Sequence, residues 1–392
     1  IGNWAFDNCF NITGSLVIPD SVTTIGESAF YGCSGFTGDL VIPDSVTTIG
    51  ESAFYGCSGI TGDLIIPDSV TTIGEFAFCN CSGFTGDLII PDSVTTIGES
   101  AFYYCSGFTG DLVISNSVTS IENFVFYYCS GFTGDLVIPN SVTSIGYHAF
   151  KGCSGFTGDL VIPNSVTTIG EYAFRQCSGF TGNLVIPNSV TIIGGSAFRE
   201  CNGFTGSLVI PNSVSIIGSL AFYCCSGFTG DLVIPNRITI IESETFDGCS
   251  NLSGVAYIPA SVIEIVGRDS LDTIDTIYGV VGSYAETYAK ENNITFIPYD
   301  FGTVSHENKK WSLEKNVAGI VVYDSESKEY LEDVKIKIGE NIYSTDQEGL
   351  VEFGATNEKV KTNIVVEKDE YITVDTVREI QNGTVAYVAM YP

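Results

Sequence analysis

The chain has 392 residues, of which 44% are hydrophobic and only 16% are charged, and its 46 acidic against 16 basic side chains give a net charge of −30. This balance excludes a nucleic-acid partner and disfavours an anionic membrane surface, because too few Lys and Arg side chains are present to neutralise phosphate groups. No run of 18 apolar residues occurs, so we expect no membrane insertion.

Eleven cysteines recur every 24 residues over the first two thirds of the sequence. They are Cys9, Cys33, Cys57, Cys81, Cys105, Cys129, Cys153, Cys177, Cys201, Cys225 and Cys249. A fixed period of this length is the signature of a solenoid, in which each repeat forms one coil and buries its apolar side chains against its neighbours. Residues 1–6 match residues 49–54, so the sequence starts within a coil, and we expect the true N-terminus and any signal peptide to lie outside it.

One coil can be read from residues 34–57. Leu40 and Ile42 are spaced by two, which points both side chains to one face of a strand. Residues 46–49 form a second, shorter extended segment, and residues 51–56 predict one helical or 3₁₀ turn. The sequence therefore predicts a β-rich solenoid of 24-residue coils, with a parallel sheet on one face and short helical or 3₁₀ turns opposite.

The repeat resembles the leucine-rich repeats of the BspA-like bacterial surface proteins. The shared phrase is Ile-Pro-Asn-Ser-Val-Thr-Ser-Ile-Gly followed by Ala-Phe and Cys-Ser, found here at residues 138–146, 149–150 and 153–154. The likeness covers residues 1–298. It implies a leucine-rich-repeat protein that is secreted or anchored at the cell surface and takes part in adhesion, with a host or neighbouring-cell protein or glycan as partner. We accordingly expect a monomeric, extracellular, non-enzymatic adhesin or binding scaffold without cofactors.

The repeat pattern fades after residue 251, and residues 262–298 are expected to cap the solenoid. Ser283 and Glu286 have the spacing of a capping box ahead of a helix that reaches residue 292, and residues 295–297 form a last strand. Residues 299–315 are expected to be a linker. Short strand-like runs at 317–323, 334–338, 351–353, 363–367 and 384–390 predict a small β-sandwich over residues 316–392. The turn at 345–349 resembles those of transthyretin-like modules in surface proteins.

Two rows of side chains are candidates for partner binding. An aliphatic row alternates with core residues and is expected to face outward from the sheet; its first members are Val41, Ile65, Ile89 and Val113. A variable row on the turns includes Tyr103, Tyr104, Tyr127 and Tyr128, with Lys151, Arg175 and Arg199 replacing tyrosine further along. Sheet propensity also explains the first row, and half-buried packing also explains the second.

A third row is acidic and suggests an alternative role as a calcium-stabilised solenoid. It comprises Asp39, Asp63, Asp87, Asp111, Asp135 and Asp159. Carboxylates about 5 Å apart repel one another, and calcium favours oxygen ligands. Carboxylates that bond backbone amides at the coil corner explain the same row without a cation.

The remaining polar residues indicate no catalytic centre. The ladder cysteines are expected to be free, buried and apolar in character, whereas Cys79 and Cys224 stand outside the ladder at a more exposed position. Only His148 and His306 could join a zinc site, so none is expected. The near-identity of the coils leaves one further alternative, a structural spacer that projects other domains of a longer polypeptide.

Overall fold

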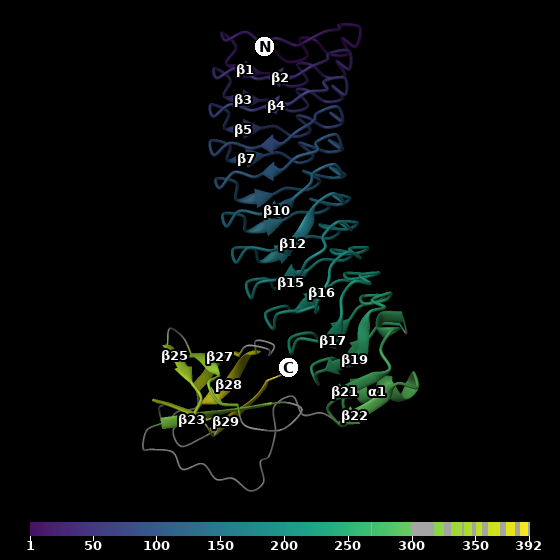
Figure 1. Cartoon of the computed structure of the whole chain (residues 1–392), viewed down its shortest axis with the longest axis vertical. Coiled ribbons are helices and arrows are strands. Elements are labelled where there is room, and N and C mark those ends of the chain that lie inside the picture. The colour runs from purple at the N-terminus through teal and green to yellow at the C-terminus, as the bar shows by residue number, and fades with distance from the viewer. Residues whose placement is uncertain are drawn as a thin grey trace.

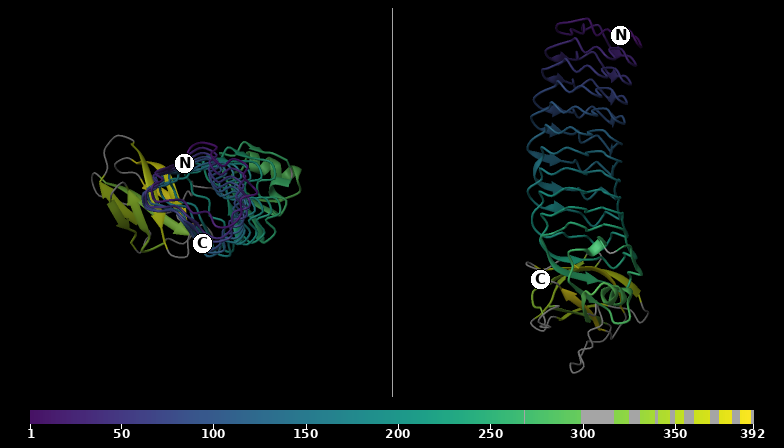
Figure 2. Two further views of the ribbon diagram at one scale, coloured as in Figure 1. Left: turned by 90° about the horizontal axis from the view of Figure 1, so that it is seen from above. Right: turned by 90° about the vertical axis from the view of Figure 1, so that its right-hand side faces the viewer.

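The computed structural model describes residues 1–267, 269–298, 317–324, 331–338, 341–346, 350–354, 360–368, 374–380 and 385–390. The described residues up to 298 wind into coils that stack along one axis, with the N-terminus at the top of Figure 1. Seen along the stack in Figure 2, neighbouring coils overlay one another while the last coils are displaced to one side, as the sideways lean of the stack in Figure 1 also shows. No described helix is long and apolar enough to cross a membrane.

One side of the stack is formed by parallel strands and is called the sheet face below. Its strands are β2 (Leu40–Val41), β4 (Leu64–Ile65), β6 (Leu88–Ile89), β8 (Leu112–Val113), β10 (Asp135–Val137), β12 (Thr157–Val161), β14 (Leu184–Val185), β17 (Gly230–Val233), β19 (Leu252–Ile258), β21 (Thr276–Gly279) and β22 (Thr295–Pro298). Leu40 pairs with Leu64 and Val41 pairs with Ile65, so the register advances by one 24-residue coil per strand. The predicted coil length and parallel sheet are confirmed.

A second row of parallel strands follows the sheet face in each coil. These strands are β1 (Thr24–Ile25), β3 (Thr48–Ile49), β5 (Thr72–Ile73), β7 (Thr96–Ile97), β9 (Ser120–Ile121), β11 (Ser144–Ile145), β13 (Thr168–Ile169), β15 (Ile192–Ile193), β16 (Ile216–Ile217), β18 (Ile240–Ile241) and β20 (Glu264–Ile265). The second residue of each strand is buried, whereas the first is half-buried or exposed. This alternation places one aliphatic side chain per coil in the core.

The remaining side of the coil, called the turn face below, differs from the prediction because it consists of successive β-turns and not of a helical or 3₁₀ turn. In one coil the amides of residues 53, 55 and 57 bond carbonyls three residues earlier, whereas those of residues 52, 54 and 56 bond carbonyls of the next coil. Ser52 and Gly56 adopt φ values of 52° and 70°, as the third residue of a type II turn requires. A helical turn bonds its amides within the coil, so it would remove this intercoil ladder.

The core consists of columns of identical side chains. The rings of Phe54 and Phe78 stack with centroids 5.4 Å apart, and the same stack continues from Phe6 to Phe246. The ladder cysteines from Cys33 onward are buried, and each donates its thiol hydrogen to the carbonyl of a core Phe in the preceding coil; Cys81 Sγ lies 2.9 Å from Phe54 O. This bond explains why a thiol serves here better than a purely apolar side chain of similar size.

The C-terminal end of the stack is closed by a helix, as the sequence predicts. The helix α1 (Tyr284–Glu291) buries Ala285, Tyr288 and Ala289, and a short 3₁₀ turn, η1 (Asp269–Leu271), precedes it. The predicted capping box does not form, because the Ser283 hydroxyl makes no capping bond and Glu286 Oε2 accepts from the amide of Gly282, the residue before the N-cap, at 2.6 Å.

Two further sheets follow in the C-terminal region. Their strands are β23 (Val317–Asp324), β24 (Lys335–Ile338), β25 (Asn341–Ser344), β26 (Leu350–Gly354), β27 (Val360–Glu367), β28 (Val374–Ile380) and β29 (Val385–Met390). One sheet has the order β26-β23-β29, with β23 and β29 parallel, and the antiparallel sheet has the order β25-β24-β27-β28. Apolar side chains of both sheets share one buried cluster, which is the arrangement of a β-sandwich. The predicted linker at residues 299–315 lies outside the described residues.

Candidate binding surfaces

The aliphatic row predicted from the sequence lies exposed along the sheet face. It comprises Val41, Ile65, Ile89, Val113, Val137, Val161, Val185 and Val209, whose exposed fractions range from 44% to 68%. Each is flanked in its strand by a buried leucine, since alternate strand positions face opposite sides. The row is therefore a continuous apolar stripe on a rigid sheet.

Two shallow hollows interrupt this stripe. The larger one, of about 500 Å³, is lined by Val113, Val137 and Pro139 together with Asp111 and Asp135. A second one, of about 380 Å³, is lined by Ile65 and Ile89 together with Asp63 and Asp87. Each hollow thus combines an apolar floor with two carboxylates at its rim.

The Asp row is exposed and bonds the backbone of the neighbouring coil. Asp39 Oδ1 accepts from the amide of Asp63 at 3.2 Å, and Asp87 Oδ1 accepts from the amide of Asp111 at 2.8 Å. Asp159 Oδ1 accepts from the amide of Asn183 at 2.6 Å. Within the described part of the chain, no group of three His, Cys, Asp or Glu side chains is placed to hold a metal ion.

The four predicted tyrosines lie together on the turn face as two parallel stacks. Tyr103 stacks on Tyr127 with ring centroids 4.6 Å apart, and Tyr104 stacks on Tyr128 at 5.2 Å. Tyr104 is 39% exposed, and the other three rings are partly buried. Burial, followed by the proximity of Tyr127 and Tyr104, raises the pKa of Tyr103 to about 12. The ring faces therefore cover one another.

His148 continues this aromatic cluster and was not identified as part of it from the sequence. Its imidazole is only 8% exposed and is sandwiched between Phe124 at 5.0 Å and Tyr172 at 4.5 Å. Burial, reinforced by the charges of Lys151 and Arg175, lowers the pKa of His148 to about 4. His148 Nδ1 has no hydrogen-bond partner among the described residues. The pattern that could have revealed it is the position it shares with Phe124 in the preceding coil.

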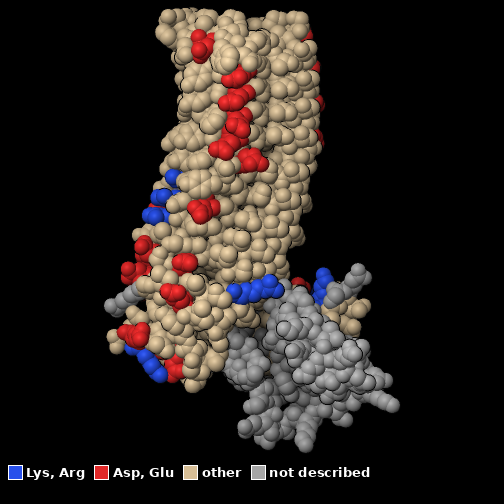
Figure 3. Space-filling view, turned by 180° about the vertical axis from the view of Figure 1, so that it is seen from behind, with Lys and Arg blue, Asp and Glu red and all other residues tan. Residues whose placement is uncertain are grey.

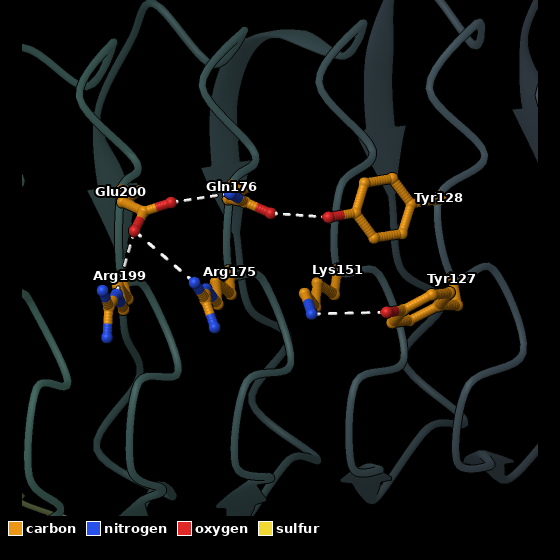
Figure 4. Close-up of polar contacts among 7 residues, drawn as sticks. All are labelled: Tyr127, Tyr128, Lys151, Arg175, Gln176, Arg199 and Glu200. Atoms are coloured by element: carbon orange, nitrogen blue, oxygen red, sulfur yellow. Dashed lines mark hydrogen bonds and ion pairs between the residues drawn. The ribbon is translucent and has the colours of Figure 1, made fainter.

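Beyond the tyrosines, Lys151, Arg175 and Arg199 occupy the same position in three consecutive coils and are called the basic column below. Lys151 Nζ lies 3.3 Å from the Tyr127 hydroxyl and 5.1 Å from the centre of its ring, an arrangement that favours the cation. Figure 4 shows these side chains side by side on neighbouring coils.

Glu200 holds the other two members of the basic column. Arg199 Nε donates to Glu200 Oε1 at 2.9 Å, and the Arg175 guanidinium lies 3.6 Å from the same oxygen. A chain of hydrogen bonds runs from the Tyr128 hydroxyl to Gln176 Oε1 at 2.9 Å, and from Gln176 Nε2 to Glu200 Oε2 at 2.7 Å (Figure 4). Burial raises the pKa of Glu200, but the bonds from Arg199 and Gln176 outweigh it, so the pKa lies below its ordinary value.

The cysteines outside the ladder differ from each other. Cys79 is buried, and burial raises its pKa to about 12, so the prediction of an exposed, reactive thiol is wrong at this position. Its side chain occupies the position of Tyr55 and Tyr103 in the adjacent coils, whose larger rings shield the smaller thiol. Cys224 is half-buried, as expected for the more accessible of the two.

Comparisons with known proteins found several similar solved structures. The solved structure of a leucine-rich repeat protein from Bacteroides ovatus is 25% identical over 76% of this chain and 87% of that chain, with a TM-score of 0.53. A leucine-rich cell surface protein from Faecalibacterium prausnitzii is 26% identical over 76% of this chain and 86% of that chain, with a TM-score of 0.46. The pneumococcal vaccine antigen PcpA is 18% identical over 71% of both chains, with a TM-score of 0.46.

No match was found among curated proteins. The family of the BspA type leucine-rich repeat region matches residues 1–133, 60–181 and 180–270, which together span more than half of the chain. These overlapping matches cover the coils of the solenoid and end at residue 270, before the closing helix α1. The protein belongs to the BspA-type leucine-rich repeat family.

Proposed function

We propose that this protein is a non-enzymatic binding scaffold displayed outside the cell, which engages a protein or glycan of a host or neighbouring cell through its repeat surface. Membership of the BspA-type family supports a binding or scaffold role. The observation that carries the proposal is the aliphatic row on the sheet face, because exposed apolar stripes with polar rims mark interaction surfaces.

The energetics of the aliphatic row suit a partner that covers several coils. Burying a half-exposed Val or Ile contributes roughly half of the ~1.5–3 kcal/mol of complete burial, so four neighbours contribute about 3–6 kcal/mol. The side chains stand on strands that hold them in place, which lowers the entropic cost of binding. The hollow at Val113 and Val137 is the best anchor, since it combines the most apolar contact with two carboxylates.

The test compares binding of the full chain to host-cell surfaces before and after Val113→Ser and Val137→Ser. The matched control is Ile216→Ser, because Ile216 is 53% exposed but lies on the second row of strands. We expect the sheet-face variant to lose at least about tenfold in affinity and the control to retain it. Binding that survives in residues 313–392 alone would contradict a role for the repeats.

A structural spacer is the second candidate, and the repetition of nearly identical coils favours it because little side-chain diversity is left to specify a partner. The tyrosine stacks distinguish the two roles. Replacing Tyr103, Tyr104, Tyr127 and Tyr128 by Ser alters the most variable part of the surface, so a binding scaffold is expected to lose affinity and a spacer to be indifferent. The measurement is cell-surface binding at matched thermal stability, made alongside the sheet-face variant, because a scaffold that binds through the sheet face alone loses affinity only in that variant and a spacer in neither.

A further inference from the structure

The basic column stands out against the charge of the solenoid. It contains three of the six basic residues found before residue 299, all in consecutive coils. An acidic row on the turn face is interrupted nearby. The same repeat position is Glu27, Glu51, Glu75 and Glu99 in the first coils, but Asn123, Tyr147, Glu171 and Gly195 in the later coils. Figure 3 shows a basic group at the edge of the stack, apart from the column of acidic side chains.

The cations of this column retain unused binding capacity. Lys151 takes part in none of the ion pairs found in the described residues. Glu200 is shared between Arg175 and Arg199, so one carboxylate is set against three positive charges. The Nε atom of Arg175 that lacks a hydrogen-bond partner among the described residues is buried, so Lys151 is the cation most open to a ligand. The column therefore offers a net positive surface, which suits oxyanions.

The polar side chains beside the column stand on left-handed backbone. Tyr128, Gln176 and Glu200 have φ values of 53°, 64° and 64° at a repeat position that holds glycine in some coils and a non-glycine residue of positive φ in others. Each costs roughly 1–2 kcal/mol relative to glycine. Gly152 stands between them, and a Cβ there would lie 2.6 Å from Tyr128 Cδ1, so its absence lets the Tyr128 hydroxyl reach Gln176 across a coil.

The geometry disfavours a peptide as the ligand. The tyrosine ring faces are occupied by each other and by Lys151, and the apolar hollow beside Tyr103 is lined by residues 55–124, in coils that precede the basic column. The amides of Gly152, Gln176 and Glu200 bond carbonyls of the next coil, so a strand cannot be added through its main chain. A hydrophilic chain with repeated negative charges needs neither an apolar pocket nor main-chain pairing with a strand, so it fits this surface.

We propose that the basic column is a binding site for an anionic polysaccharide. Successive coils are about 4.8 Å apart, so Lys151 and Arg199 stand at either end of a cationic row of about 10 Å, which can engage sulfate or carboxylate groups on neighbouring sugar units. The sugar hydroxyls meet the polar chain formed by Tyr128, Gln176 and Glu200. This site lies on the turn face and does not depend on the partner proposed for the sheet face.

The test measures binding of the full chain to immobilised heparin, to hyaluronan and to uncharged dextran over a series of salt concentrations. We expect binding to heparin or hyaluronan but not to dextran, and a weakening of affinity with salt as counterions are released. Binding to hyaluronan would show that carboxylate groups are sufficient for recognition, whereas binding to heparin alone would show that sulfate groups are required. The variant Lys151→Gln/Arg175→Gln/Arg199→Gln is expected to lose at least about tenfold in affinity and most of its salt dependence.

Two controls separate this site from general effects. Arg237→Gln removes an exposed positive charge elsewhere on the solenoid and is expected to leave binding unchanged. Glu200→Gln removes the only carboxylate that pairs with the column among the described residues, and it is expected to tighten binding, an outcome that a folding defect cannot produce. The proposal is overturned if neither polysaccharide binds at low salt, if the triple variant binds as the unmodified chain does, or if poly-glutamate binds more tightly than both. The sheet-face variants at Val113 and Val137 should bind the polysaccharide normally, which separates this site from the proposed function.

Discussion

The first coils and the middle coils of the solenoid share one internal frame but present different surfaces. Residues 1–110 carry twelve acidic and no basic side chains, whereas residues 111–225 carry six acidic and three basic ones. In both regions the Phe column is buried and the strand register advances by 24 residues. Stability and recognition therefore depend on different columns of the same repeat, and the predictions below test that separation.

The largest expected effect concerns the shared frame. Phe54→Ala in the first coils and Phe150→Ala in the middle coils each remove a fully buried ring from the stack, and we expect each to lower the free energy of unfolding by about 3–5 kcal/mol. Chemical denaturation of both variants measures it. A loss confined to one region would show that the two parts of the solenoid do not share one frame.

A smaller effect distinguishes the two regions at equivalent glycines. Gly56→Ala and Gly152→Ala both place a side chain at positive φ, which costs roughly 1–2 kcal/mol. At Gly56 the nearest atom is 3.8 Å from the new Cβ, whereas at Gly152 the Tyr128 ring must move and its bond to Gln176 is lost. We therefore expect Gly152→Ala to be about 1 kcal/mol more destabilising. Equal thermal stabilities of the two variants would contradict the proposed interaction across Gly152.

His148 gives the middle coils a dependence on pH that the first coils lack. Its folded-state pKa of about 4 lies below the ordinary value of 6.5, so the unfolded chain binds an additional proton between these values. The contribution of His148 to the free energy of unfolding is fully present above about pH 6.5. It decreases by on the order of 2 kcal/mol as the pH falls towards 4. Protonation would place a charge among the rings of Phe124 and Tyr172 and beside Lys151 and Arg175.

The matched variant for this prediction is His148→Phe, which copies the residue at the equivalent position of the preceding coil, Phe124. Denaturation curves at pH 7 and pH 4.5 measure the difference between the two proteins, and the difference cancels the titration of the many carboxylates. An identical pH response in the variant would assign the dependence to other groups.

The smallest expected effect is the response to a chelator. Carboxylates of the Asp row accept hydrogen bonds from backbone amides in both regions, at Asp39 and Asp87 in the first coils and at Asp159 in the middle coils. Because these bonds satisfy one oxygen of each carboxylate, and no three acidic, His or Cys side chains among the described residues are placed to hold a metal ion, we expect EDTA to leave the melting temperature unchanged. A clear decrease that calcium reverses would support the calcium-stabilised alternative.

The frame could be read from the sequence because its chemistry repeats. Two features of the sequence predict the sheet, the core columns and the outward aliphatic row: the spacing of Leu40 and Ile42, and the 24-residue period. The turn face was less predictable, since its amides bond the next coil and no local pattern distinguishes such turns from a helical turn. The thiol bond from Cys81 to Phe54 was missed for the same reason.

The middle coils were harder to interpret than the frame. The bond between Tyr128 and Gln176 joins residues 48 positions apart, and it depends on Gly152 in the coil between them. Only the arrangement in space shows that Glu200 holds Arg175 and Arg199 together, or that Cys79 is covered by neighbouring tyrosines. Repetition in the sequence predicts the shared frame, whereas contacts between coils that differ in sequence depend on the arrangement of the coils in space.

The stacking of coils in register is tested most directly by the distance between two spin labels at Val41 and Val161, introduced through an unnatural amino acid so that the native thiols remain untouched. Both side chains are exposed on the sheet face and stand five coils apart. We predict a narrow distribution near 24 Å between the backbone positions, from about 4.8 Å per coil. A broad distribution, or one centred far from this value, would contradict the account.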